Sequence, residues 1–131
     1  MLRILNADVD PISEHDGTVT SWFMYPKESV RSITEGSYLE FVNEFQLEPG
    51  ISMQPHLHNS HEFYYVLKGG GMMRVDDEER AMVPGDLVHI APNEAHSFRA
   101  GDDGVRCFAF AVSFMAPGES FSVAELENWE H

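Results

Sequence analysis

The chain has 131 residues, which favours one domain with a core large enough to fold without disulfides. Its 8 basic and 22 acidic side chains give a net charge of −14. A charge of this sign repels phosphate backbones and anionic lipid, so we expect neither nucleic acid nor a membrane as partner. The single cysteine, Cys107, excludes an intrachain disulfide and is expected to be a small buried side chain. Because the N-terminus lacks an apolar signal core, we expect a cytoplasmic protein.

Strand-like segments dominate the first half of the chain. Residues 18–25 are rich in β-branched and aromatic side chains and end at a proline, which predicts a strand. A polar stretch follows, and residues 37–47 then alternate between apolar and polar positions, which predicts a second strand. One face of this strand carries Leu39, Phe41, Phe45 and Leu47 with Asn43 as a polar exception, and the other carries Glu40 and Glu44.

The second half continues the same pattern. Residues 62–68 predict the clearest strand, with Glu62, Tyr64 and Val66 on one face, and three glycines then break it before residues 72–75 resume. Shorter strands are predicted at residues 80–83, 87–90, 95–99 and 105–114, with turns between them. Ser122 and Glu125 form a capping box, which predicts a short C-terminal helix. Strands at this spacing are typical of an all-β sandwich or barrel.

Residues 50–69 contain a compact group of metal-binding side chains. His56 and His58 are two residues apart, so both leave an extended strand on the same face. Glu62 follows a turn-like interruption that can fold the chain back toward them. Two imidazoles and a carboxylate form a partial shell for a divalent metal, and a fourth ligand must come from elsewhere.

This stretch resembles the first motif of the cupins, G-x5-H-x-H-x3-E-x6-G, at every fixed position: Gly50, His56, His58, Glu62 and Gly69. The second cupin motif, G-x5-P-x-G-x2-H-x3-N, begins at Gly85 and places its histidine at His96. The chain departs from it at Ala91, Asn93 and Ala100, which replace the proline, the second glycine and the final asparagine. The two motifs cover residues 50–69 and 85–100.

The resemblance implies a single cupin domain over residues 1–131, a double-stranded β-helix (jelly-roll) barrel, here with a short C-terminal helix. By motif position it implies one divalent metal ion held by His56, His58, Glu62 and His96. The sequence does not choose among iron, manganese, nickel and zinc. Tyr64 shares the face of Glu62 and is a candidate catalytic residue lining the cavity. His61 and His89 are expected at the surface, with an interface open to His89, and His15 is expected to have no role.

Two classes of function fit these features. The first is an enzyme of the dioxygenase or lyase/decarboxylase type, which binds a small metal-chelating substrate at the open metal positions. Oxalate decarboxylases, which the chain resembles, carry an arginine where this chain has Met72, and Arg74 lies further along the same face. The alternative is a non-catalytic module that binds or senses a small ligand through the metal. Small cupins are commonly dimers, so a homodimer is expected.

Overall fold

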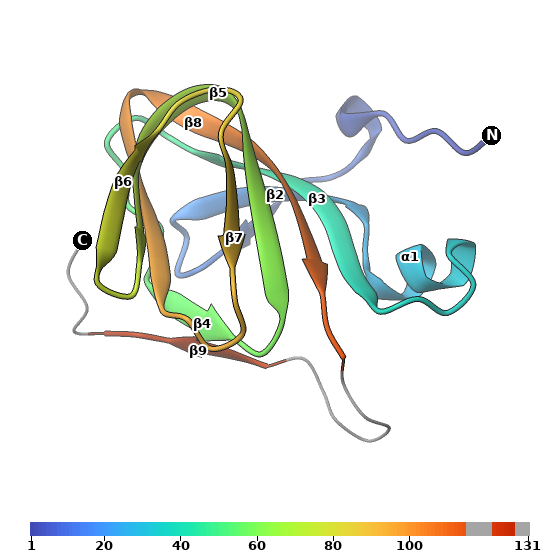
Figure 1. Ribbon diagram of the computed structural model, residues 1–131. Helices are drawn as coiled ribbons and strands as arrows, with labels where there is room; N and C mark the ends of the chain where they lie inside the picture. The colour runs from blue at the N-terminus through green and yellow to red at the C-terminus, as the bar shows by residue number, and fades with distance from the viewer. Residues whose placement is uncertain (115–121, 128–131) are drawn as a thin grey trace.

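The computed structural model describes residues 1–114 and 122–127, which form one curled sheet of nine antiparallel strands (Figure 1). The elements are, in chain order, η1 (Asn6–Asp8), β1 (Ile12–Glu14), β2 (Val19–Tyr25), α1 (Lys27–Ile33), β3 (Leu39–Leu47), β4 (His56–His58), β5 (His61–Val75), β6 (Glu78–Met82), β7 (Leu87–Ile90), β8 (His96–Val112) and β9 (Val123–Glu125). The predicted all-β class is confirmed. Within the described ranges, no helix has the length and apolar character needed to cross a bilayer.

Two long strands organise the sheet. The first half of β5 pairs with the second half of β8, from His61 opposite Val112 to Gly69 opposite Val105. The second half of β5 pairs with the first half of β8, ending at Val75 opposite His96. β7 and β6 add to the free edge of β5, and the other strands follow the order β1-β2-β3-β8-β4-β9. The sheet therefore curls on itself and encloses one interior (Figure 1).

The glycine run after residue 68 does not break its strand as predicted. β5 continues through Gly69, Gly70 and Gly71, with register shifts at this point. A Cβ atom on Gly69 would lie 2.0 Å from the carbonyl oxygen of Gly104, and one on Gly71 would lie 2.0 Å from that of Arg99. The glycines thus let two backbones approach where the strands bend. Instead of the predicted break, the structure has a bend at which the backbones of β5 and β8 pack closely together.

The predicted turn at residues 101–104 is likewise part of a strand. The structure joins the expected strands 95–99 and 105–114 into the single strand β8. Gly101 and Gly104 lie at the bend, and Gly104 has a φ of +72°, a conformation that L side chains rarely adopt. The turn-forming residues therefore mark a bend within β8. The strand continues through this bend because its partner β5 bends at the same place.

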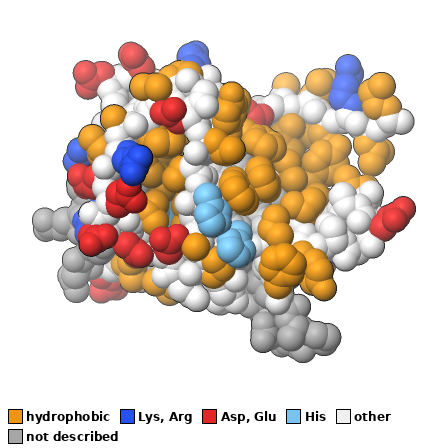
Figure 2. Space-filling model, viewed as in Figure 1, with side chains coloured by type: hydrophobic (Ala, Val, Ile, Leu, Met, Phe, Trp, Pro, Cys, Tyr) orange, Lys and Arg blue, Asp and Glu red, His pale blue; other side chains and the backbone are white. Residues whose placement is uncertain are grey.

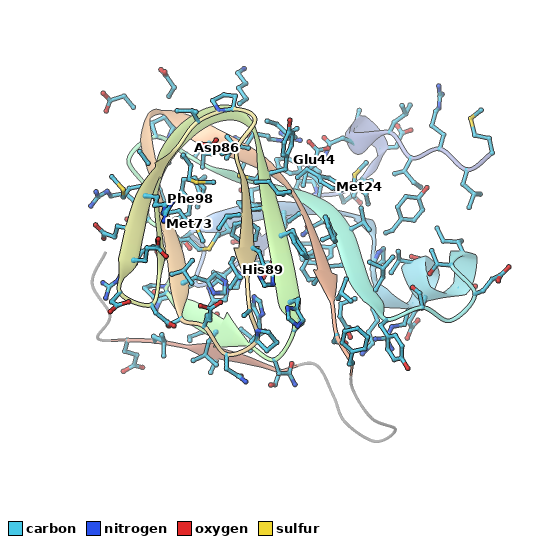
Figure 3. All side chains as sticks on the ribbon, viewed as in Figure 1. Met24, Glu44, Met73, Asp86, His89 and Phe98 are labelled. Atoms are coloured by element: carbon cyan, nitrogen blue, oxygen red, sulfur yellow. The ribbon has the colours of Figure 1, made fainter. Side chains whose placement is uncertain are left out.

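The interior face of the sheet carries the core. Phe45, Leu47, Tyr64 and Val66 are each 3% exposed or less, as the alternation predicts. Met73 of β5 lies opposite Phe98 of β8 at the other end of the barrel (Figure 3), and both are buried. Cys107 is fully buried in the same cluster, which confirms its expected place.

Glu40 departs from the predicted alternation. The pattern places it on the polar face of β3, but it is 3% exposed. The pairing of β3 with β8 shifts register between Leu39 and Phe41, and this irregularity turns Glu40 inward. Its carboxylate accepts a hydrogen bond from Arg31 at 2.7 Å and lies 3.3 Å from the ammonium of Lys27, so the buried charge is paired.

Two elements near the ends of the chain also differ from expectation. Helix α1 is absent from the predicted elements; it forms within the polar stretch, buries only Val30, and is tied to β3 through Arg31. The predicted C-terminal helix is wrong where the chain is described, because residues 123–125 form β9 and pair with β4. Neither Ser122 nor Glu125 then serves as a helix cap, and the last four residues of the chain lie outside the described ranges.

Candidate metal centre

The two histidines of β4 point into the interior from one strand face. They are 1% and 4% exposed, in agreement with the two-residue spacing of His56 and His58. β4 pairs with β8 at a single position, His56 opposite His96, and this pairing brings in a third imidazole that is fully buried. Glu62 follows on β5 and is 7% exposed. The structure thus gathers the four residues that the resemblance implies as ligands.

The three imidazoles form a tight cluster. Their candidate ligand atoms all lie within 4.8 Å of one another. The ring centroids are 4.3 Å apart between His56 and His96, and 4.8 Å apart between His58 and His96. Donor atoms that share one metal ion at bond lengths of about 2.1 Å lie within about 4.2 Å of one another, which is close to the 4.8 Å limit for these atoms. The cluster is therefore a candidate metal site by geometry as well as by sequence motif.

Backbone contacts set which nitrogen faces the cluster centre. The Nδ1 atom of His56 lies 2.9 Å from the carbonyl oxygen of Gln54, and that of His96 lies 2.9 Å from the carbonyl oxygen of Glu94. Because a carbonyl oxygen only accepts, each Nδ1 carries the proton and donates it. Each Nε2 is then left with a lone pair, which is the state a metal ligand needs.

Glu62 completes the cluster. Its Oε2 atom contacts Nε2 of His58 and lies 3.9 Å from Nε2 of His96. Within the described part of the chain, neither Glu62 Oε2 nor His96 Nε2 has a hydrogen-bond partner, although both atoms are buried. Leaving such atoms unsatisfied costs about 1–3 kcal/mol each. A divalent cation bound between them would satisfy both, so the residues present fit a metal.

Burial keeps two of the histidines in the neutral form. It lowers the pKa of His56 to about 4, and the neighbouring His15 adds to this effect. Burial also lowers the pKa of His96 well below its usual value, together with repulsion from His56 and His58. For His58, burial acts in the same direction, but its contact with Glu62 outweighs burial and raises the pKa. Neutral imidazoles are the form that binds metals.

Tyr64 lies beside this cluster in the cavity wall. Its side chain is 2% exposed, with its ring 6.2 Å from that of His96 and 4.8 Å from that of Phe45. Burial raises the pKa of Tyr64 well above its usual value, and the charge of Glu62 and a hydrogen bond to it add to this shift. Tyr64 is therefore a neutral phenol that donates toward the carboxylate of Glu62.

The cluster opens onto a cavity of about 220 Å³. Much of its lining is apolar and comes from β2, β3, β5 and β8, and Lys27 is the one lysine or arginine among the lining residues that the structure describes. Beyond the metal cluster and Tyr64, the polar residues that line it are Glu14, His15, Ser21, Lys27, Glu40 and Asn43. A cavity of this size takes a small molecule, and its apolar walls strengthen electrostatic interactions inside.

Sequence patterns do not reveal the two residues that β1 and the following turn bring to this cavity. Glu14 accepts a 2.5 Å hydrogen bond from Ser21, and burial raises its pKa. The expectation that His15 has no role is at odds with its position, because its ring stacks on His56 with centroids 3.8 Å apart, and its Nδ1 lies 3.2 Å from Glu125 of β9. The only sequence signal near these two residues is the turn at residues 15–17. In the structure, the φ angles of all three turn residues are positive.

His61 and His89 lie on the opposite face of the sheet from the cavity, as expected. Their rings stack with centroids 5.2 Å apart, and His61 Nδ1 lies 2.9 Å from His89 Nε2. Histidine and hydrophobic side chains adjoin on this outer face (Figure 2). Arg74 lies opposite Ser97 of β8, and its Nε donates to the backbone oxygen of Asp76 near the end of β5. It does not line the cavity.

Comparison with known proteins agrees with this architecture. The chain is similar to the dimethylsulfoniopropionate lyase DddW of Ruegeria pomeroyi, with 34% identity over 68 residues, or 52% of this chain and 43% of the lyase. The chain thus matches less than half the length of that relative.

Solved structures share the fold at lower identity. A predicted oxalate decarboxylase of Thermotoga maritima superposes with a TM-score of 0.73 and 21% identity, covering 86% of this chain and all of that one. The polyketide cyclase RemF of Streptomyces resistomycificus gives a TM-score of 0.68 and 22% identity over 99% of this chain and 88% of the cyclase. The family model for the cupin domain matches residues 43–113, which is more than half of the chain. The chain therefore belongs to the cupin domain family.

Proposed function

We propose that this protein is a divalent-metal-dependent enzyme that acts on a small, oxygen-chelating organic molecule. The observation that carries the proposal is two buried atoms without a hydrogen-bond partner in the described part of the chain, Glu62 Oε2 and His96 Nε2, in a cluster of which His56, His58 and Glu62 line a cavity. The ligands would be His56, His58, Glu62 and His96. Four protein ligands leave open positions on a five- or six-coordinate ion, so the bound metal would act as a Lewis acid toward substrate oxygens.

The residues around the cluster would orient ligands and hold a proton. The carbonyls of Gln54 and Glu94 fix the rings of His56 and His96. Tyr64 donates toward Glu62 and, as the tyrosine that lines the cavity, is our candidate for giving a proton to the substrate. The apolar walls exclude water from the reacting end of the cavity.

Among the reactions open to such a site, we favour a lyase-type reaction over decarboxylation of oxalate or oxygen insertion. The relative DddW is a lyase by name. Oxalate carries two negative charges, whereas the cavity offers few cations in the part of the chain that is described: no arginine lines it, and Lys27 already lies 3.3 Å from Glu40. A neutral or singly charged substrate suits a cavity with so few cationic side chains better than oxalate does.

We also propose that residues 1–131 act as one cupin domain. Strands β1, β2 and β9 lie outside the segment that the family model matches. Even so, Glu14, Ser21 and Val123 from these strands line the same cavity as the metal cluster. The contribution of strands on both sides of the matched segment to one cavity supports a single domain.

Substitution of a single ligand tests the metal assignment. Purified His58→Ala should lose most of its bound divalent metal, because it removes one of four donors from a site that needs them together. The measurement is metal per chain by elemental analysis, and His89→Ala is the matched control, since His89 lies outside the cavity. Near-stoichiometric metal in His58→Ala, equal to the control, contradicts the assignment.

Turnover by the loaded protein tests the enzyme proposal. Protein reconstituted separately with iron, manganese, nickel and zinc should convert a member of a panel that includes dimethylsulfoniopropionate, hydroxy acids, diketones and catechols. Tyr64→Phe should lower kcat while leaving the metal content unchanged. Tight binding without product for every metal and compound indicates a sensing module instead.

The outer face of β5, β7 and β8 supports a further proposal, that two copies of the chain form a dimer. Phe63 stacks on Phe110 there with ring centroids 4.7 Å apart, and Tyr65, Leu67 and Leu87 are 40–59% exposed. Hydrophobic side chains gather over these strands (Figure 2). Apolar surface of this kind is typical of contacts between protein chains.

A further inference from the structure

Asn43 is a polar side chain in the middle of an apolar strand face. It lies on β3 between Phe41 and Phe45, is 4% exposed, and lines the cavity. The pairing of β3 with β8 and of β8 with β5 places Asn43, Ala109 and Tyr64 in one row across the sheet. All three residues line the cavity, and Ala109, in the middle of the row, has the smallest side chain.

The amide oxygen of Asn43 has nothing to bond with among the residues that the structure describes. Its Oδ1 atom is buried and without a hydrogen-bond partner, in contrast to two other polar groups of the cavity wall. Glu14 bonds to Ser21, and Glu40 is paired with Arg31 and Lys27. An unpaired buried acceptor destabilises the fold, whereas an apolar residue would suit this face. Stability alone therefore does not account for Asn43.

We propose that Asn43 is a specificity-determining residue, which binds a hydroxyl group of the substrate at the end remote from the metal. This proposal rests on the proposed function and deepens it. It defines the substrate class as small hydroxylated acids or ketones, with one pair of oxygens for the metal and a second, separate hydroxyl for Asn43. The hydroxyl donates to Oδ1, and the amide nitrogen of Asn43 can donate to the same hydroxyl oxygen or to a neighbour.

Charge favours a hydroxyl over an ammonium group as the donor. The same cavity would hold a divalent cation close by, and its apolar walls strengthen repulsion between like charges. Size also limits the substrate, because about 220 Å³ accommodates only a small molecule. A neutral donor on a short carbon chain satisfies both conditions.

Replacing Asn43 by leucine separates a recognition role from a structural one. Leucine has a similar volume and no polar atom, so the metal-free Asn43→Leu protein should unfold at the same temperature as the parent or a higher one. The measurement is the midpoint of thermal unfolding. A lower midpoint in Asn43→Leu means that the amide stabilises the fold through its own contacts, and overturns the proposal.

Binding of matched probes tests the hydroxyl directly. The probes are 2,4-dihydroxybutyrate and 2,5-dihydroxypentanoate, each compared with its counterpart that lacks the distal hydroxyl, on cobalt-loaded protein followed by its visible spectrum. At least one diol should bind about tenfold more tightly than its counterpart, the effect expected for one buried hydrogen bond to an otherwise unpaired group. In Asn43→Leu, or in Asn43→Ala if the leucine variant does not fold, this ratio should fall to about one, with the cobalt content unchanged.

Failure of the inference and failure of the proposed function give different results. Protein that takes up cobalt but binds each diol and its counterpart equally overturns the inference and leaves the metal site intact. If the diol still binds more tightly than its counterpart in the Asn43 variants, another residue binds the hydroxyl, and the proposal for Asn43 is overturned too. If the parent protein takes up no cobalt, the proposed function fails, and with it the substrate class that rests on it.

Discussion

The thiol of Cys107 illustrates how burial controls the chemistry of a single residue. It lies on β8 between Phe45 of β3 and Val66 of β5, in the centre of the core, with no exposed surface. Burial raises its pKa to about 12. The thiolate, which is the reactive form, is then present in about one molecule in ten thousand at pH 8.

Cys107 should therefore be inert in the native protein. At pH 8 a disulfide reagent such as Ellman's should release no colour from folded protein within an hour, and one equivalent per chain after unfolding in guanidinium. Burial excludes the reagent, and the raised pKa removes the nucleophile. Rapid reaction of the folded protein would show that the core around β8 opens readily.

At the residue scale, sequence predicts what depends on local spacing and misses what depends on tertiary contact. The two-residue spacing of His56 and His58 and the alternation through Glu62 and Tyr64 predict a shared inner face, and all four side chains are buried. Glu40 is misplaced because a register shift between β3 and β8 is not encoded by alternation within β3. His15 is missed because its contact with His56 spans 41 positions of sequence.

At the scale of elements, the glycines of β5 show that one residue type can signal opposite structures. A glycine run between apolar segments usually predicts a turn. Here a side chain on Gly71 would collide with the backbone of Arg99 in the paired strand β8. The run therefore marks continuous pairing at very close range, which sequence patterns do not distinguish from a break.

Gly71→Ala should destabilise the protein by about 3 kcal/mol, since the new Cβ atom meets backbone that cannot move aside without disturbing the pairing of β5 and β8. The measurement is the free energy of unfolding in urea. Gly101→Ala is the matched control, because its Cβ would lie 3.5 Å from the nearest atom, an ordinary contact. Equal losses in the two variants would contradict the close approach at Gly71.

Helix α1 and strand β9 are the elements that sequence predicts least well. α1 spans seven residues and depends on Val30 in the core and on Arg31 bonded to β3. Its hydrophobic periodicity is too short to detect. β9 is a strand because β4 offers an edge to pair with, and this pairing outweighs the local capping preference of Ser122 and Glu125. In both elements, tertiary contacts determine the conformation.

At the scale of the whole molecule, charge restricts where two copies can meet. With a net charge of −14, most pairs of surfaces repel one another at low salt. The outer face of β5, β7 and β8 carries the stacked Phe63 and Phe110 and the paired rings of His61 and His89. The proposed dimer would use this face, because it brings few negative charges together.

Leu87→Asp should shift the protein from dimer to monomer. Leu87 is 59% exposed and lies opposite Tyr65 on this face, so a carboxylate there would be buried against a second copy. The measurement is molar mass by light scattering after size exclusion. Ile33→Asp, at an exposed apolar position on α1, is the control and should stay dimeric. A monomeric parent protein, or equal behaviour of the two variants, contradicts the dimer.

The metal cluster and part of the cavity lining come from different segments of the chain. This limits how much of the function can be inferred from relatives. The segment that the family model matches holds the metal cluster, Tyr64 and Ala109. Another part of the cavity lining, with Glu14, His15 and Ser21, belongs to strands and a turn before that segment. Homology over the matched segment thus carries information about the metal chemistry and about only part of the substrate site, the part that includes Asn43. Exchange of the first 25 residues between two family members should therefore change which compound is accepted while the metal stays the same.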